Sequence, residues 1–225
     1  MASPLDLQEQ EQIDNLKVFW ARHGNLITWL LTAALLAYAG WNGWQWWQRD
    51  QGAKAGAIYD ELDRATQAAD AERVGRIFAD LRERHPRTTY AQQGGLLAAR
   101  VLSDKGKADE ARAALAWVGA NAVEDEYRTL ARLRLAAQLM DAKKHDEALK
   151  ELAAATAPTF AALVADRRGD VLLAQGRTAD ARAAYETAWK GMDAALGYRQ
   201  LIEAKLTALG APPAVVAAPA AGASK

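Results

Sequence analysis

The stretch GKADEA at residues 106–111 decides the fold of this chain, because two related stretches follow it. They are KKHDEA at residues 143–148 and GRTADA at residues 176–181, so the final alanine recurs at intervals of 37 and then 33 residues. Self-similarity at a period of about 20 to 50 residues is typical of solenoids and other repeat arrays. The sequence therefore predicts a row of similar structural units.

Small and large residues occupy fixed positions around the repeated alanine. Twelve residues before it the chain has Ala99, Ala136 and Gly169; nine before it Leu102, Leu139 and Leu172; and four after it Leu115, Leu152 and Tyr185. A small residue lets two helices approach closely, and a large residue fills the space beside it. With a Gly or Lys at each turn, this pattern predicts helix-turn-helix packing.

These units resemble the tetratricopeptide repeat in their small-residue and alanine/aromatic positions. Asp109 and its two repeat equivalents fall in the first turn of the second helix, where a carboxylate complements the helix dipole. The aromatic residue that is usual early in the first helix is missing from all units. A fourth, degenerate unit precedes the others, with Val74 in the place of the alanine, Phe78 at the large position and Pro86 as the closing proline.

The N-terminal part of the chain carries a long uncharged segment. No Asp, Glu, Lys or Arg occurs between Arg22 and Arg49, and about 20 mainly apolar residues can cross a hydrocarbon core of about 30 Å as a helix. Tryptophans prefer the headgroup level of a membrane. We therefore predict a transmembrane helix at residues 24–47. Its predicted interface anchors are Trp20, Trp41, Trp44, Trp46 and Trp47.

Two other interpretations of this segment are a buried core helix and a cleaved signal peptide. Thr28, Thr32, Asn42 and Gln45 interrupt the apolar run. A core helix would nevertheless need a polar face that the segment lacks. Residues 37–39, Ala-Tyr-Ala, have the small-x-small form of a signal-peptidase site, but the leader before Gly24 carries four acidic residues against Lys17 and Arg22, unlike a positive export signal. An uncleaved anchor is the favoured interpretation.

The rest of the chain, up to residue 209, is predicted to be helical. Alanine, the best helix former, is abundant, and hardly any window alternates β-branched and polar residues as a strand would. Residues 197–209 suit a helix that caps the open end of the stack, whereas the Ala/Pro-rich composition of residues 210–225 predicts a disordered tail. We expect an all-α fold, in which a single N-terminal transmembrane helix precedes a tetratricopeptide-repeat-like α-solenoid at residues 48–209.

Charge and motifs exclude several kinds of function. Basic and acidic residues balance at 28 each, with no basic cluster, so nucleic-acid binding is not expected. The chain has no cysteine, and its three histidines, His23, His85 and His145, lie in different elements without a second ligand at helical spacing. Phosphate-binding glycine loops and nucleophile-elbow motifs do not occur. We therefore expect no enzyme activity, metal site or cofactor.

Seven residues are candidates for a partner-binding groove on the concave face of the array. They are Leu96, Arg100, Leu130, Leu133, Met140, Asp166 and Asp170. Asp166 and Asp170 are four residues apart on one helix, where two like charges repel unless a cation intervenes. Either they face the groove, or they pair with Arg167, Arg168 or a neighbouring helix. The apolar candidates have the alternative of lying in the core.

Two longer stretches extend the resemblance to a whole-chain family. The leader EQIDNLKVFWARHG at residues 11–24, which runs straight into the anchor, resembles the start of the YfgM-like family, the ancillary subunits of the bacterial SecYEG translocon. ADRRGDVLL at residues 165–173, with Gly176 and Ala181-Arg182 after it, is similar to the last repeat of that family. The resemblance covers residues 8 to about 209, and the tail after Gly210 departs from it.

The resemblance implies a single-pass inner-membrane protein with a cytoplasmic leader at residues 1–23 and a periplasmic repeat domain. Such proteins associate with the SecYEG translocon and with a membrane-anchored periplasmic chaperone of the prolyl-isomerase type, and they help exported client proteins leave the channel. The alternative is a scaffold or regulator that binds one folded partner in envelope stress signalling or envelope assembly. The charges that flank the anchor leave its orientation open.

Overall fold

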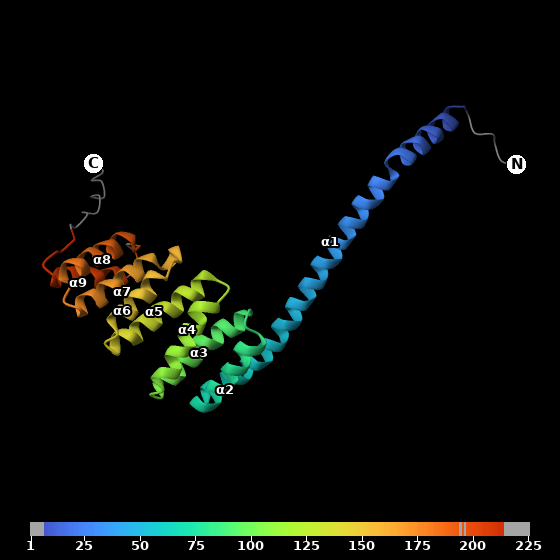
Figure 1. Cartoon of the computed structure of the whole chain (residues 1–225). Helices are drawn as coiled ribbons and strands as arrows, with labels where there is room; N and C mark the ends of the chain where they lie inside the picture. Colours follow the sequence, from blue (N-terminus) through green and yellow to red (C-terminus); the bar gives the residue numbers. More distant parts are fainter. Residues whose placement is uncertain (1–6, 194, 196, 214–225) are drawn as a thin grey trace, which may run out of the picture. The chain divides into compact units, whose positions relative to one another are not determined.

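The computed structural model describes residues 7–193, 195 and 197–213, and all regular structure in this part of the chain is helical (Figure 1). The helices are α1 (Leu7–Gln67), α2 (Ala71–Arg84), α3 (Thr89–Asp104), α4 (Ala108–Asn121), α5 (Asp125–Asp141), α6 (His145–Ala153), the short 3-10 helix η1 (Pro158–Phe160), α7 (Ala161–Ala174), α8 (Thr178–Gly191) and α9 (Tyr198–Ala208). The predicted all-α fold is confirmed. Residues 1–6 of the predicted leader and 214–225 of the predicted tail lie outside the described residues.

The chain divides into two compact units, Met1–Gln51 and Gly52–Lys225, which are described separately. The first contains the apolar part of α1, and its length and composition suffice to cross a membrane. Only 6% of that apolar window is buried, and Trp29, Leu30, Leu35 and Leu36 are all exposed. A core helix would bury such side chains against the rest of the chain. The structure therefore favours the membrane helix over the buried core helix.

The polar residues that interrupt this apolar segment are hydrogen-bonded within the helix itself. The hydroxyls of Thr28 and Thr32 each donate to the carbonyl oxygen four residues earlier, both at 2.8 Å. The amide of Asn42 donates to the carbonyl of Tyr38 at 2.9 Å, and Gln45 accepts from Arg49 at 3.4 Å. Polar groups that find partners inside their own helix are tolerated where no water is present. These four residues are therefore compatible with a membrane span.

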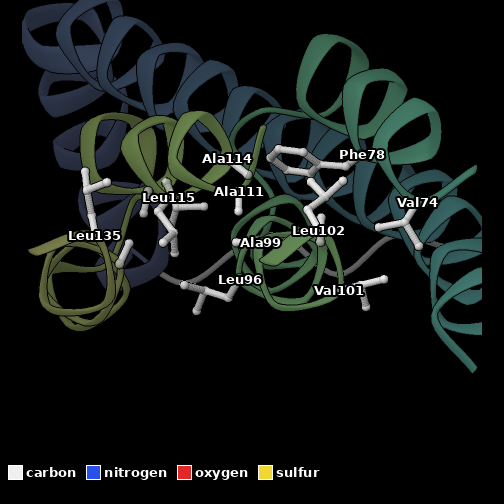
Figure 2. Close-up of a cluster of buried hydrophobic side chains, with 14 of the residues drawn as sticks. Val74, Phe78, Leu96, Ala99, Val101, Leu102, Ala111, Ala114, Leu115 and Leu135 are labelled. Atoms are coloured by element: carbon white, nitrogen blue, oxygen red, sulfur yellow. The ribbon is translucent and has the colours of Figure 1, made fainter. Parts of the chain in front are cut away.

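The second unit is a linear stack in which each helix from α2 to α9 packs chiefly on its neighbours in the sequence (Figure 1). The repeated alanines Ala111, Ala148 and Ala181 are fully buried, as is Val74 in the degenerate unit. Figure 2 shows Phe78, Leu102 and Ala111, from three successive helices, together in this core. Because contacts run between successive helices, stability is spread along the stack. The predicted helix-turn-helix units are confirmed.

The turns that end the first helix of each unit share one backbone geometry. Ala69, Gly106, Lys143, Gly176 and Gly210 have positive φ angles of 52°, 75°, 60°, 75° and 71°. In each turn the N–H of the following residue donates to a carbonyl oxygen five residues earlier, at 2.8 to 3.1 Å. This is the Schellman arrangement, in which a left-handed residue ends a helix. Its occurrence at an alanine and a lysine shows that packing imposes the turn even where glycine is absent.

The helix α9 begins a fifth unit that the described chain does not complete. Gly210 lies 34 residues after Gly176 and repeats its turn, and Leu206 is buried at the position of the earlier leucines. The small-residue position, however, holds the exposed Glu203. At the equivalent Gly169 even a methyl group would lie 2.5 Å from the ring of Tyr185. A glutamate there leaves no room for a closely packed second helix, and α9 packs on α8 at the end of the described stack.

Candidate functional site

Two of the predicted groove residues, Leu96 and Arg100, lie together in a pair of adjoining hollows beside α3 and α5. The larger hollow has a volume of about 460 Å³ and is also lined by Leu115, Arg134 and Gln138. The smaller, of about 250 Å³, is lined by Gln93, Leu96, Leu97, Arg100 and Arg134. We call the two hollows together the α3–α5 groove.

The sequence analysis missed Arg134, which lines both hollows. A signal for it was present, because Arg134 follows the predicted groove residue Leu130 by four residues, and such residues share one face of a helix. Its guanidinium makes no ion pair or hydrogen bond with any described residue. Arg100 reaches only Asp104, at 3.9 Å, and both side chains are largely exposed. The α3–α5 groove therefore carries two positive charges, of which Arg100 faces Asp104 in the lining of the same hollow and Arg134 has no counter-ion among the described residues.

Met140 and Asp170 line a different hollow, of about 640 Å³, with Leu173 and Tyr185 among the other residues. Leu130 is partly buried against the main core, and Leu96 and Leu133 are core residues with only 8% and 6% of their surface exposed. The structure therefore supports core packing for Leu133, whereas Leu96 both packs in the core and lines the hollow. The seven candidates do not form one continuous site in the structure.

The acidic pair of α7 is neutralised by the capping helix. The ammonium of Lys205 lies 2.8 and 2.9 Å from the two carboxylate oxygens of Asp166 and 2.7 Å from Oδ1 of Asp170. The hydroxyls of Tyr198 and Tyr185 donate to Asp166 and Asp170 at 2.7 and 2.8 Å. Asp170 also pairs with Arg167 of its own helix at 3.4 Å. Of the alternatives left open by the sequence, the structure supports pairing, with a neighbouring helix for both carboxylates and with Arg167 for Asp170. Asp166 is fully buried, so this network is not a pair of free charges on an open face.

Both tyrosines of this network are held as neutral hydrogen-bond donors. Burial and the hydrogen bond to Asp166 raise the pKa of Tyr198 to about 12. Burial, together with the hydrogen bond to Asp170, raises the pKa of Tyr185 still further. Ionising either phenol would remove the proton that it donates and place a second negative charge beside a carboxylate. Neither tyrosine is therefore poised to exchange a proton near neutral pH.

The predicted membrane anchors are exposed aromatic side chains of the first unit. Trp20, Trp41, Trp44, Trp46 and Trp47 all have about half or more of their surface accessible. The rings of Trp44 and Trp47 lie with their centroids 5.3 Å apart. Exposed tryptophans grouped at the end of an apolar helix are typical of a membrane interface. Among the described residues, no group of three or more histidines and carboxylates could hold a metal ion.

A stack of helical hairpins, preceded in the sequence by an exposed apolar helix, defines the class of protein, a repeat protein with a candidate membrane anchor. The model of a family described as "Tetratricopeptide repeat-like domain" matches residues 17–211. A protein of Neisseria gonorrhoeae named "Ancillary SecYEG translocon subunit" is 31% identical over 90% of this chain and 98% of its own length. Proteins with the same name from Escherichia coli and Haemophilus influenzae are 28% and 27% identical over 81% of this chain, and 87% and 89% of theirs.

The chain belongs to this tetratricopeptide-repeat-like family of ancillary SecYEG translocon subunits. The resemblance seen in the leader and the last repeat is thereby confirmed over nearly the whole chain. The names of the relatives describe a translocon subunit and indicate no catalytic activity.

Proposed function

We propose that this protein is a single-pass accessory subunit of the SecYEG translocon in the bacterial inner membrane, and that its repeat domain holds exported polypeptides as they leave the channel. The observation that carries the proposal is the match to relatives of that name over almost their full length. The exposed apolar helix, with its polar side chains satisfied internally, supplies the anchor.

The mechanism is retention near the exit of the channel. A binding surface tethered beside the place where a client emerges meets it at a far higher effective concentration than the same surface free in solution. Holding requires no bond making or breaking, which agrees with neutral tyrosines and an ion-paired acidic network as the best-formed polar features. The holding surface that we propose includes Leu96 and Arg100 in the α3–α5 groove, with Met140 in the neighbouring hollow.

The proposal includes an orientation and a second partner. The leader is cytoplasmic, the repeat domain is periplasmic, and a membrane-anchored chaperone of the prolyl-isomerase type receives the held polypeptide. Both parts follow from the family resemblance. A helical repeat stack suits such a transfer, because its extended surface can contact a client and a folded partner at different helices.

A second candidate function is a scaffold or regulator that binds one folded partner in the cell envelope. The observation in its favour is the placed positive charge of the α3–α5 groove, where Arg134 lacks a counter-ion. A surface that accepts many unfolded clients is expected to be broad and apolar, whereas a dedicated partner site carries placed charges.

Crosslinking in living cells separates the two functions. A photoreactive amino acid at Ser103, which lines the larger hollow, is expected to capture many different exported proteins if the domain holds clients. Capture of a single species would establish the scaffold instead. The same amino acid at Arg76, an exposed residue of α2 outside these hollows, is the matched control. Absence of SecYEG subunits from the full-length protein purified in mild detergent would overturn the proposed translocon association.

A further inference from the structure

A basic groove lies in the middle of the repeat array. Arg100 of α3 and Arg134 of α5 line both adjoining hollows of the α3–α5 groove, together with the apolar side chain of Leu96. Leu97 adds apolar surface in the smaller hollow. Guanidinium groups beside an apolar floor bind carboxylates more strongly than guanidinium groups in open water, because the floor excludes part of the solvent. Asp104 also lines the larger hollow, with its carboxylate 3.9 Å from Arg100. The groove thus combines a net positive charge, centred on Arg134, with apolar contact surface.

In the repeat register, the arginine without a counter-ion lies in the middle of the array. The position of Arg100 is occupied by Asp63 in the unit before it and by Asp170 in the last unit. The position of Arg134 is occupied by Leu97 in the unit before and by Arg167 in the last unit, where Arg167 pairs with Asp170 at 3.4 Å. Asp170 is already paired with Lys205. An anionic ligand therefore has one favoured register along the stack, with its charge opposite α3 and α5.

Gln138 offers a separate indication of a ligand. Its side-chain oxygen is buried at the larger hollow and accepts no hydrogen bond from the described protein. Buried acceptors almost always have a donor, and a missing donor destabilises the free protein. An extended polypeptide presents a main-chain N–H on the same edge at every second residue. Such a ligand can satisfy Gln138 while its side chains contact the arginines.

We propose that the α3–α5 groove binds an extended polypeptide segment in which an acidic side chain stands beside apolar ones. The carboxylate lies between Arg100 and Arg134, an apolar neighbour packs on Leu96 and Leu97, and a main-chain N–H donates to Gln138. This inference rests on the proposed function, since it specifies the chemistry of the segment that the repeat domain holds. The identity of the groove's occupant follows from charge complementarity.

Binding of fluorescent peptides to the full-length protein tests the proposal. The protein is held in nanodiscs of phosphatidylcholine, and the probe is a short peptide with a central Glu-Glu pair between leucines and an amidated C-terminus. We expect this peptide to bind about tenfold or more tightly than the otherwise identical Gln-Gln and Lys-Lys peptides, because hydrogen bonds to charged groups are the stronger ones. The preference should shrink at high ionic strength. Equal binding of the three peptides would overturn the proposal.

Charge reversal identifies the residues responsible. The double variant Arg100→Glu and Arg134→Glu is expected to lose the preference for the Glu-Glu peptide, and the milder Arg100→Gln and Arg134→Gln pair serves if the first does not fold. Arg76→Glu, which changes an exposed arginine of α2, is expected to leave binding unchanged. Retained preference in the folded double variant, or competition by phosphatidylglycerol vesicles as strong as by the peptide, would contradict a polypeptide ligand in this groove.

Gln138→Met provides a readout that a purely structural residue would not give. Replacing an unsatisfied buried acceptor with an apolar side chain of similar size should leave the melting temperature unchanged or raise it. Peptide affinity should nevertheless fall, since the proposed main-chain contact is lost. An unchanged affinity would remove Gln138 from the site.

Failure of this inference can be told from failure of the proposed function. If wild-type protein copurifies with SecYEG but binds the three peptides equally, only the proposed chemistry of the groove is wrong. If it prefers the Glu-Glu peptide but does not copurify with SecYEG, the groove stands and the translocon role is wrong.

Discussion

Lys205 and Asp166 form a salt bridge across 39 residues of sequence that fastens the capping helix α9 to the first helix of the last complete unit, α7. The ammonium contacts both oxygens of the fully buried carboxylate and reaches Asp170 as well. A buried ion pair contributes little net stability compared with apolar packing, but removing one partner leaves the other charge buried and unpaired, which is destabilising. Lys205 is therefore the cation that balances both carboxylates, beside the hydrogen bond from Tyr198 to Asp166 and the buried Ile202 and Leu206 of the same helix.

Lys205→Met is expected to destabilise the protein by about 3 kcal/mol, because it leaves Asp166 buried without its cation. The estimate is at the lower end of the usual range because Lys205 is itself 22% exposed. Chemical unfolding of the full-length protein in detergent, followed by circular dichroism, measures the change. Lys190→Met, at an exposed lysine of α8, is the control and should have little effect. Equal stabilities of the two variants would show that the network is dispensable.

Asp170→Ala is expected to lower stability by about 1 to 3 kcal/mol, which is the cost of leaving a buried donor unsatisfied. Its carboxylate accepts hydrogen bonds from Tyr185 and Lys205. The sequence alone predicts the opposite, because removing one of two like charges four residues apart relieves a repulsion with Asp166. The lysine that cancels that repulsion reverses the expectation. Asp166→Ala should be more damaging, and an unchanged melting temperature for Asp170→Ala would restore the sequence-based view.

The contrast between the repeats and this network shows which features could be predicted from the sequence. The positions of Ala111, Ala148 and Ala181 follow from local periodicity, since each unit packs its small residues in the same way. Local periodicity could not identify the partner of Asp166, because Lys205 lies in an incomplete unit. The left-handed conformation of Ala69 could not be predicted for another reason, since alanine does not favour a positive φ angle. Charges without counter-ions, such as Arg134, become recognisable only when neighbouring helices are placed.

Alkaline unfolding should depend on Tyr198. Its pKa is raised to about 12 in the folded protein, against about 10 in an unfolded chain. Stability from this phenol is therefore fully present below about pH 10 and is lost as the pH rises toward 12, because the unfolded state releases its proton first. Tyr198→Phe should be less stable at pH 8 and should lose part of the decline above pH 10. Parallel pH profiles for the two proteins would contradict this assignment.

Ala111→Leu should destabilise the repeat domain by about 1 to 3 kcal/mol, because extra methylenes in a filled core force neighbouring side chains apart. Ala111 is fully buried at the close approach of α3 and α4. Ala113→Leu makes the same chemical change at an exposed position of the same helix, so its effect should be small. Thermal unfolding of both variants provides the comparison. Equal melting temperatures of the two variants would show that the close helix contact at the repeated alanine does not contribute to stability.

The orientation of the protein in the membrane is the remaining prediction, and flanking charge does not decide it. Lys17 and Arg22 precede the apolar segment, whereas Arg49, Lys54 and Arg64 follow it, a difference too small for the positive-inside rule. Because the chain has no cysteine, a single introduced thiol reports its own side of the membrane. Lys105→Cys, at an exposed turn between α3 and α4, should react with an impermeant maleimide on intact spheroplasts. Gln12→Cys in the leader should react only after lysis. The opposite pair of results would place the repeat domain in the cytoplasm, away from exported proteins, and the holding function would then be untenable.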